Sequence, residues 1–134
     1  MVDALYEATR VVRKGGLVVD ARPDSRVHAR LEHAGRIVGA MRTQVETGAL
    51  DDASDRALVA VLKGGALVSR RQGRFWQRVP FGDLRTLRAY ARDHARFERR
   101  IQWLPQARER SRGWDRDPVV LIRPVRYELL ERRA

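Results

Sequence analysis

Three ionisable residues follow an apolar run near the start of the sequence. Asp20, Arg22 and Asp24 come directly after the residues at 17–19. Open α/β sheets place their ligands beyond the carboxyl ends of strands, so carboxylates and a guanidinium at this point could bind a polar ligand. These three are therefore the candidate ligand residues. The competing interpretation, which we favour, is that Asp20 and Arg22 pair with neighbours or cap a turn.

The motifs of several enzyme classes do not occur in the sequence. It contains no cysteine, so it cannot form a thiolate nucleophile, a disulfide or a Cys-ligated metal site. His28, His33 and His94 lack the i, i+4 spacing of a helical zinc site, and no serine lies in a G-x-S-x-G motif. The sequence thus predicts no catalytic residue, no cofactor in the isolated chain and no metal site.

Positive charge dominates the composition. Lysine and arginine total 28 against 17 aspartate and glutamate residues, which gives a formal net charge of +11. Such an excess is typical of polyanion binding, but also of an arginine-rich composition, and both interpretations stay open. Nucleic acid or another polyanion is a candidate partner, although a charged stripe is more often the solvated face of a helix. The arginines concerned are Arg70, Arg71, Arg74, Arg85, Arg88, Arg92, Arg96 and Arg99.

The element that must position the first three candidates is a helix that turns into a strand. Leu5, Ala8 and Val12 are spaced for one face of a helix, and Gly15-Gly16 supplies the conformational freedom that ends it. The run at 17–19 has no polar alternation. This pattern predicts a central strand that is covered on both faces.

The segment from Leu5 to Pro23 resembles part of the class I S-adenosylmethionine-dependent methyltransferases. In that family a helix beginning "ALxEaxRvL" continues through "kpGG" into the fifth sheet strand, and here the residues read LYEATRVVRKGGLVV. The family binds its cofactor with a glycine-rich loop and an acidic residue, which both lie upstream of this segment. The resemblance therefore implies a C-terminal portion of that fold without its cofactor half. Its implied function is a non-catalytic or partner-dependent module.

The next stretch supports two interpretations. Alternating apolar residues at 27–41 predict a hairpin, whereas apolar residues stepping by three and four over 27–45 fit a helix. We favour the hairpin because Gly35 and Gly39 would each cost ~1 kcal/mol inside a helix.

Two helices and a second hairpin are expected in the remainder. A helix begins at Asp51 and ends before Gly64, and a hairpin at 66–79 carries Gln72-Gly73 at its tip. A helix followed by a basic hairpin resembles a winged-helix DNA-binding unit, but this helix is acidic and would repel phosphates. The most amphipathic helix runs from Asp83 to Arg100, with Ile101 on its apolar side.

The sequence pattern in the last 30 residues predicts a short helix and a final strand. The helix follows Pro105, and the strand occupies 119–127, where Pro124 indicates a bulge or an edge position. The whole reads as one α+β domain over residues 1–134, with a mixed sheet, two hairpins and three main helices.

The predicted half-fold has consequences for partners and location. Its uncovered sheet edge predicts a homodimer or other oligomer, with Phe75, Trp76 and Phe81 near the interface. A separate chain that carries the missing half is the alternative. The N-terminus has no apolar signal core and no run has membrane-spanning length, so we expect a cytoplasmic protein with no membrane partner.

Overall fold

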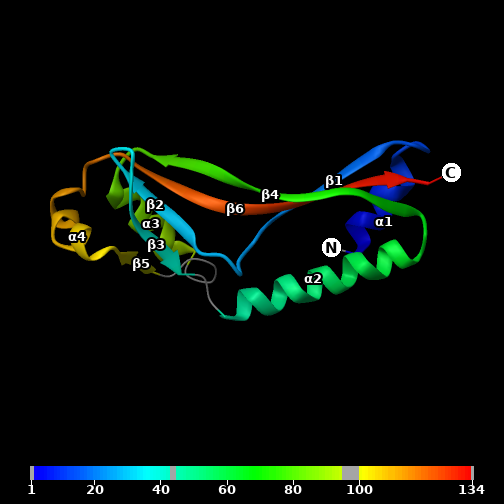
Figure 1. The fold of residues 1–134 in the computed structure, drawn as a ribbon, viewed down its shortest axis with the longest axis horizontal. Helices are drawn as coiled ribbons and strands as arrows, with labels where there is room; N and C mark the ends of the chain where they lie inside the picture. The colour runs from blue at the N-terminus through cyan, green and yellow to red at the C-terminus, as the bar shows by residue number, and fades with distance from the viewer. Residues whose placement is uncertain (1, 43–44, 95–99, 134) are drawn as a thin grey trace. The chain divides into compact units, whose positions relative to one another are not determined.

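The structure is a computed structural model that describes residues 2–42, 45–94 and 100–133. It confirms the α+β class (Figure 1). The elements in chain order are α1 (Val2–Val11), β1 (Leu17–Pro23), β2 (Ala29–His33), β3 (Arg36–Arg42), α2 (Val45–Lys63), β4 (Leu67–Phe81), α3 (Leu84–Asp93), β5 (Arg100–Trp103), α4 (Pro105–Arg108), the 3-10 helix η1 (Arg110–Gly113) and β6 (Val119–Arg132).

Hydrogen bonds connect the strands in the order β1-β6-β2-β3-β5, and β4 also pairs with β6. The pairings with a defined register are antiparallel, whereas the sequence predicted a mixed sheet. The chain groups into two compact units. Unit 1 comprises residues 1–23, 49–75 and 125–134, and unit 2 comprises 24–48 and 76–124, so that β4 and β6 contribute to both.

In unit 1, helices α1 and α2 cover one face of the strands (Figure 1). Their apolar sides form a small core with β4 and β6. A glycine with positive φ lies in the turn after each helix, Gly15 at 73° after α1 and Gly65 at 77° after α2, a conformation that glycine adopts without steric cost. The helix, Gly-Gly and strand pattern predicted at both places is confirmed. The core residues are Leu5, Leu58, Val61, Leu67 and Leu130.

The prediction that β1 is a central strand is wrong. β1 lies at the end of the strand order, with β6 as its neighbour among the described strands. Its side chains alternate between exposed and half-buried, and Leu17 and Val19 are 57% and 63% exposed. The half-buried side chains face α2, since Val18 packs on the unit 1 core. On the opposite face of β1, the apolar side chains of Leu17 and Val19 are largely exposed.

In unit 2, the hairpin predicted at 27–41 is confirmed as β2 and β3, and the rival helix is excluded. Leu31 lies opposite Gly39 in β3 and opposite Leu121 in β6, so β2 is an interior strand. Gly39 is required because a Cβ there would lie 2.7 Å from the carbonyl oxygen of Gln102 in β5. Strands β2, β3 and β6 pack against α3 and α4 through buried residues that include Leu31, Met41, Leu84, Leu87, Ala107 and Leu121.

The second predicted hairpin does not form. β4 runs from Leu67 to Phe81 as one strand through Gln72 and Gly73, which also removes the winged-helix interpretation. The glycine serves close packing instead of a turn, because a Cβ on Gly73 would lie 2.8 Å from the Tyr127 hydroxyl oxygen.

Pro124 lies inside β6, where the sequence predicted a bulge or an edge. The edge prediction is wrong, since β6 pairs with three strands, β1, β2 and β4. The pairing partner changes at this proline: Ile122 lies opposite Arg30 of β2, and Val125 lies opposite Pro23 of β1. A residue without an N–H is tolerated there because the ladder is interrupted.

Two helix boundaries also differ from the sequence prediction. α2 begins at Val45, so Asp51 lies inside the helix and does not cap it. Ala49 and Leu50 are strong helix formers that extend it upstream. α3 ends at Asp93, and Arg100 and Ile101 belong to β5, where Ile101 pairs with Met41.

Asp83, where the predicted helix begins, is the N-cap of α3. Its carboxylate accepts a hydrogen bond of 2.6 Å from the Thr86 backbone N–H, and hydrogen bonding from Thr86 lowers the pKa of Asp83. We expect Asp83→Ala to lower the free energy of unfolding by about 1 kcal/mol, because the first turn loses its acceptor. Asp83→Ser should recover most of this in a urea titration. Equal losses in both variants would contradict the capping role.

Candidate functional site

Two of the three predicted ligand residues belong to an ion network in unit 1. Arg22 Nε lies 3.0 Å from Asp20 Oδ2 without the alignment of a hydrogen bond, and Arg22 Nη1 lies 3.5 Å from Asp55 Oδ1. Arg126 of β6 lies 2.6 Å from Asp55 Oδ1 and donates to Oδ2 at 2.7 Å.

The ion network balances two positive charges that the strand register places side by side. Arg22 and Arg126 lie directly opposite each other in the β1·β6 ladder, an arrangement that repels. Their side chains are only 17% and 16% exposed. Asp55 of α2 contacts both guanidinium groups and, together with Asp20 beside Arg22, balances their two charges while it attaches the helix to the strands.

Asp24, the third candidate, is engaged in a turn. Its side chain is fully buried, and its Oδ1 accepts hydrogen bonds from the backbone N–H and the Nε of Arg26. Its own carbonyl accepts from the Val27 N–H. The contacts of Asp20, Arg22 and Asp24 are thus those of ion pairing and turn formation.

The outer edge of β1 exposes backbone groups. Arg132 N–H donates to the Gly16 carbonyl and Asp24 N–H donates to the Pro124 carbonyl, at the two ends of the β1·β6 ladder. Hydrogen bonding alternates along an antiparallel pair, so the intervening even-numbered residues face β6. The N–H and C=O groups of Leu17, Val19 and Ala21 therefore point away from it.

The aromatic residues predicted near an interface have different environments. Phe75 and Trp76 are 46% and 38% exposed. Phe75 contacts Tyr127 in unit 1, and the Arg30 guanidinium lies 4.4 Å from the Trp76 ring centroid in unit 2. Phe81 packs against the unit 2 core instead.

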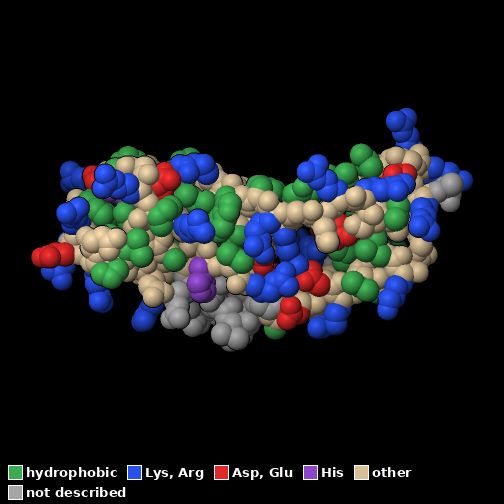
Figure 2. Space-filling view, in the orientation of Figure 1, with side chains coloured by type: hydrophobic (Ala, Val, Ile, Leu, Met, Phe, Trp, Pro, Cys, Tyr) green, Lys and Arg blue, Asp and Glu red, His purple; other side chains and the backbone are tan. Residues whose placement is uncertain are grey.

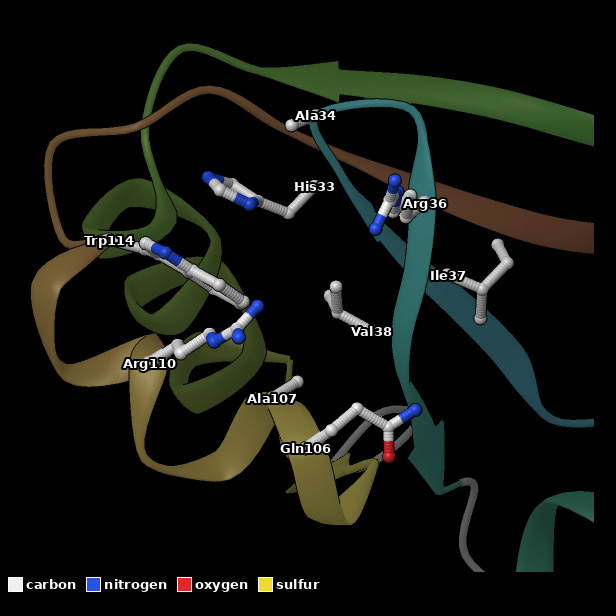
Figure 3. A pocket seen from close by; sticks show the side chains of 9 residues that line it. All are labelled: His33, Ala34, Arg36, Ile37, Val38, Gln106, Ala107, Arg110 and Trp114. Carbon is white, nitrogen blue, oxygen red and sulfur yellow. The ribbon is translucent and has the colours of Figure 1, made fainter.

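A pocket of about 440 Å³ lies in unit 2, between the β2–β3 turn and the segment formed by α4 and η1 (Figure 3). Its apolar wall includes Val38 and Ala107, which are buried, and Trp114. Arg36 and Arg110 approach it from opposite sides (Figure 3). The full lining is His33, Ala34, Arg36, Ile37, Val38, Gln106, Ala107, Arg110 and Trp114.

His33 is held in the pocket wall by two contacts. Its Nε2 lies 2.9 Å from Asp117 Oδ2, and because a carboxylate only accepts, Nε2 is the donor. Its ring stacks on Trp114 with a centroid distance of 4.0 Å, and Trp103 meets Trp114 edge-on at 5.9 Å. The imidazole therefore has a fixed ring plane and tautomer.

Several of the predicted polyanion-binding arginines form ion pairs. Arg70 donates to Glu131 at 2.6 Å and lowers the pKa of that carboxyl, and Arg88 pairs with Asp115. Arg92 lies 3.8 Å from Asp93. Figure 2 likewise shows acidic side chains beside several basic ones on the visible face. Polyanion binding stays a prediction for this set, of which Arg96 and Arg99 lie outside the described residues.

Sequence patterns did not reveal several residues at these sites. Asp55 and Arg126 are 71 positions apart, and His33 and Asp117 are 84 apart. No motif links such pairs, because strand pairing and helix packing bring them together. The one available signal was the excess of arginine over lysine, since Arg is the usual partner in partly buried ion pairs.

No family model, curated protein or solved structure matches the chain. The described residues contain no group of three His, Asp or Glu side chains that could hold a metal ion. Within the same residues, no helix is both long and apolar enough to cross a membrane.

Proposed function

We propose that this chain is a partner-dependent, methyltransferase-like module whose strand β1 completes its sheet with a strand from a cofactor-binding half. The observation that carries the proposal is the outer edge of β1. Leu17 and Val19 are largely exposed there, and the backbone groups of alternate residues point away from β6. An exposed edge with apolar side chains is a template for strand addition.

The order of elements supports the choice of partner. The helix, Gly-Gly and strand that resemble the methyltransferase segment are α1 and β1. In the methyltransferases, the strand that β1 resembles follows the cofactor-binding half of the fold. In this chain, β1 is the strand whose outer edge is proposed to pair with that half. The missing half belongs to another part of a longer protein or to a second chain.

A second copy of this chain is a weaker occupant of the edge. Each copy carries a formal net charge of +11, so two copies repel each other at long range. Charge favours a neutral or acidic partner instead.

S-adenosylmethionine titration and light scattering test the proposal. We expect no saturable heat when the cofactor is titrated calorimetrically into the isolated chain, and a monomeric mass at tens of micromolar protein. Stoichiometric cofactor binding by the isolated chain would overturn the proposal, because the cofactor half would then be unnecessary.

If the protein is unexpectedly dimeric, the variant Val19→Pro tests whether the dimer forms through the outer edge of β1. Its proline removes an N–H that points away from β6, so the β1·β6 ladder is retained. A dimer that this variant dissociates would mean that a second copy, and not a cofactor half, occupies the edge.

A further inference from the structure

The unit 2 pocket is independent of the β1 edge and has its own chemistry. Its volume of about 440 Å³ lies within the range of small-molecule sites. It combines an apolar wall of Val38, Ala107 and Trp114 with a few polar groups at its rim. Such a combination is typical of sites that enclose an apolar body and orient one polar group.

Two guanidinium groups at this pocket have no ion-pair partner among the described residues. Arg36 begins β3 and Arg110 begins η1, and both side chains are exposed. This contrasts with Arg70, Arg78 and Arg88, each of which contacts a carboxylate. Two uncompensated guanidinium groups on either side of a pocket favour an oxyanion, which they can bind bidentately.

The histidine adds a third polar group. Asp117 accepts from His33 Nε2, which leaves Nδ1 as an acceptor without a hydrogen-bond partner in the described part of the chain, so it suits a hydroxyl or N–H group of the ligand and not its oxyanion. Stacking on Trp114 fixes the ring plane, so this atom is held in place without a ligand. Preorganised polar groups bind ligands at lower entropic cost.

We propose that the pocket lined by His33, Arg36, Arg110 and Trp114 binds a small molecule with an oxyanion, phosphate or carboxylate, on a flat apolar body. The oxyanion contacts Arg36 and Arg110, and the apolar body lies against Val38, Ala107 and Trp114. This proposal does not depend on the function proposed for the edge of β1.

Phenyl phosphate, benzoate and benzyl alcohol are suitable probes, since they share a ring and differ in the polar group. Binding is followed by calorimetry and by tryptophan fluorescence. Fluorescence is suitable because Trp114 lines the pocket and the Trp103 ring contacts the Trp114 ring. We expect saturable one-to-one binding of phenyl phosphate or benzoate. Whichever of the two binds more tightly identifies the oxyanion, and benzyl alcohol should bind at least about tenfold more weakly.

Arginine variants separate the pocket from general charge. Arg36→Gln and Arg110→Gln should each weaken oxyanion binding about tenfold, as expected for loss of one charged hydrogen-bond donor. Arg71→Gln removes the same charge from an exposed position in unit 1 and should leave the affinity unchanged. Thermal unfolding of each variant verifies that it is folded.

Three results would overturn the proposal. The first is no saturable binding of either anion at millimolar concentration. The second is an equal affinity for benzyl alcohol, and the third is a loss of affinity in Arg71→Gln as large as that in the two pocket variants.

Discussion

Replacing Asp55 with asparagine should lower the free energy of unfolding by about 2–3 kcal/mol, because the change removes the carboxylate that two partly buried guanidinium groups share and leaves only Asp20, beside Arg22, to offset their charges in this network. Arg22 and Arg126 are opposite residues in the β1·β6 ladder, and Asp55 contacts both. The asparagine retains the shape of the side chain, so the loss reports charge and not packing. Urea unfolding followed by circular dichroism measures it.

Asp93→Asn is the matched control for this experiment. Asp93 also lies near an arginine, but the two side chains are 68% and 76% exposed and 3.8 Å apart. Exposed ion pairs contribute little, so this variant should change the free energy of unfolding by less than about 0.5 kcal/mol. Equal effects of the two variants would contradict the role assigned to Asp55.

Local patterns predicted the elements whose cause is local. The turns that follow α1 and α2 contain Gly15 and Gly65, whose positive φ needs no neighbour outside the segment. The helix expected from Asp83 begins there because Asp83 caps α3 through a residue three positions away. The hairpin of β2 and β3 was predicted correctly because glycines disfavour the rival helix.

Errors arose where distant residues decide the conformation. Gln72-Gly73 has the composition of a turn, yet β4 passes through it because Tyr127 packs where a side chain on Gly73 would lie. The apolar run of β1 is typical of a buried strand, but the described strands cover only one of its edges. Whether a strand is buried depends on which elements pack against it in the fold, and the composition of the strand alone does not specify those elements.

The candidate site was only partly predictable for the same reason. Asp20 and Arg22 were identified from their place at the end of a strand, and the structure brings them together. Their partner Asp55 and the pocket pair His33 and Asp117 depend on tertiary contacts between distant segments. Single residues such as these carry no sequence signature until the fold is known.

Amide hydrogen exchange along β1 tests the central claim most directly, since the claim is that the outer edge of β1 is free to accept a strand. The amides of Val18, Asp20 and Arg22 face β6, and those of Leu17, Val19 and Ala21 point away from it. Hydrogen-bonded amides in a stable ladder exchange through opening reactions, whereas unpaired ones exchange without them.

We predict that Leu17, Val19 and Ala21 exchange at least about 100-fold faster than the three residues that face β6, which corresponds to an opening free energy of about 3 kcal/mol. Light scattering on the same sample verifies that the protein is monomeric. Equal protection of both sets in the monomer would contradict the account, because another segment of the chain would then already occupy the edge of β1.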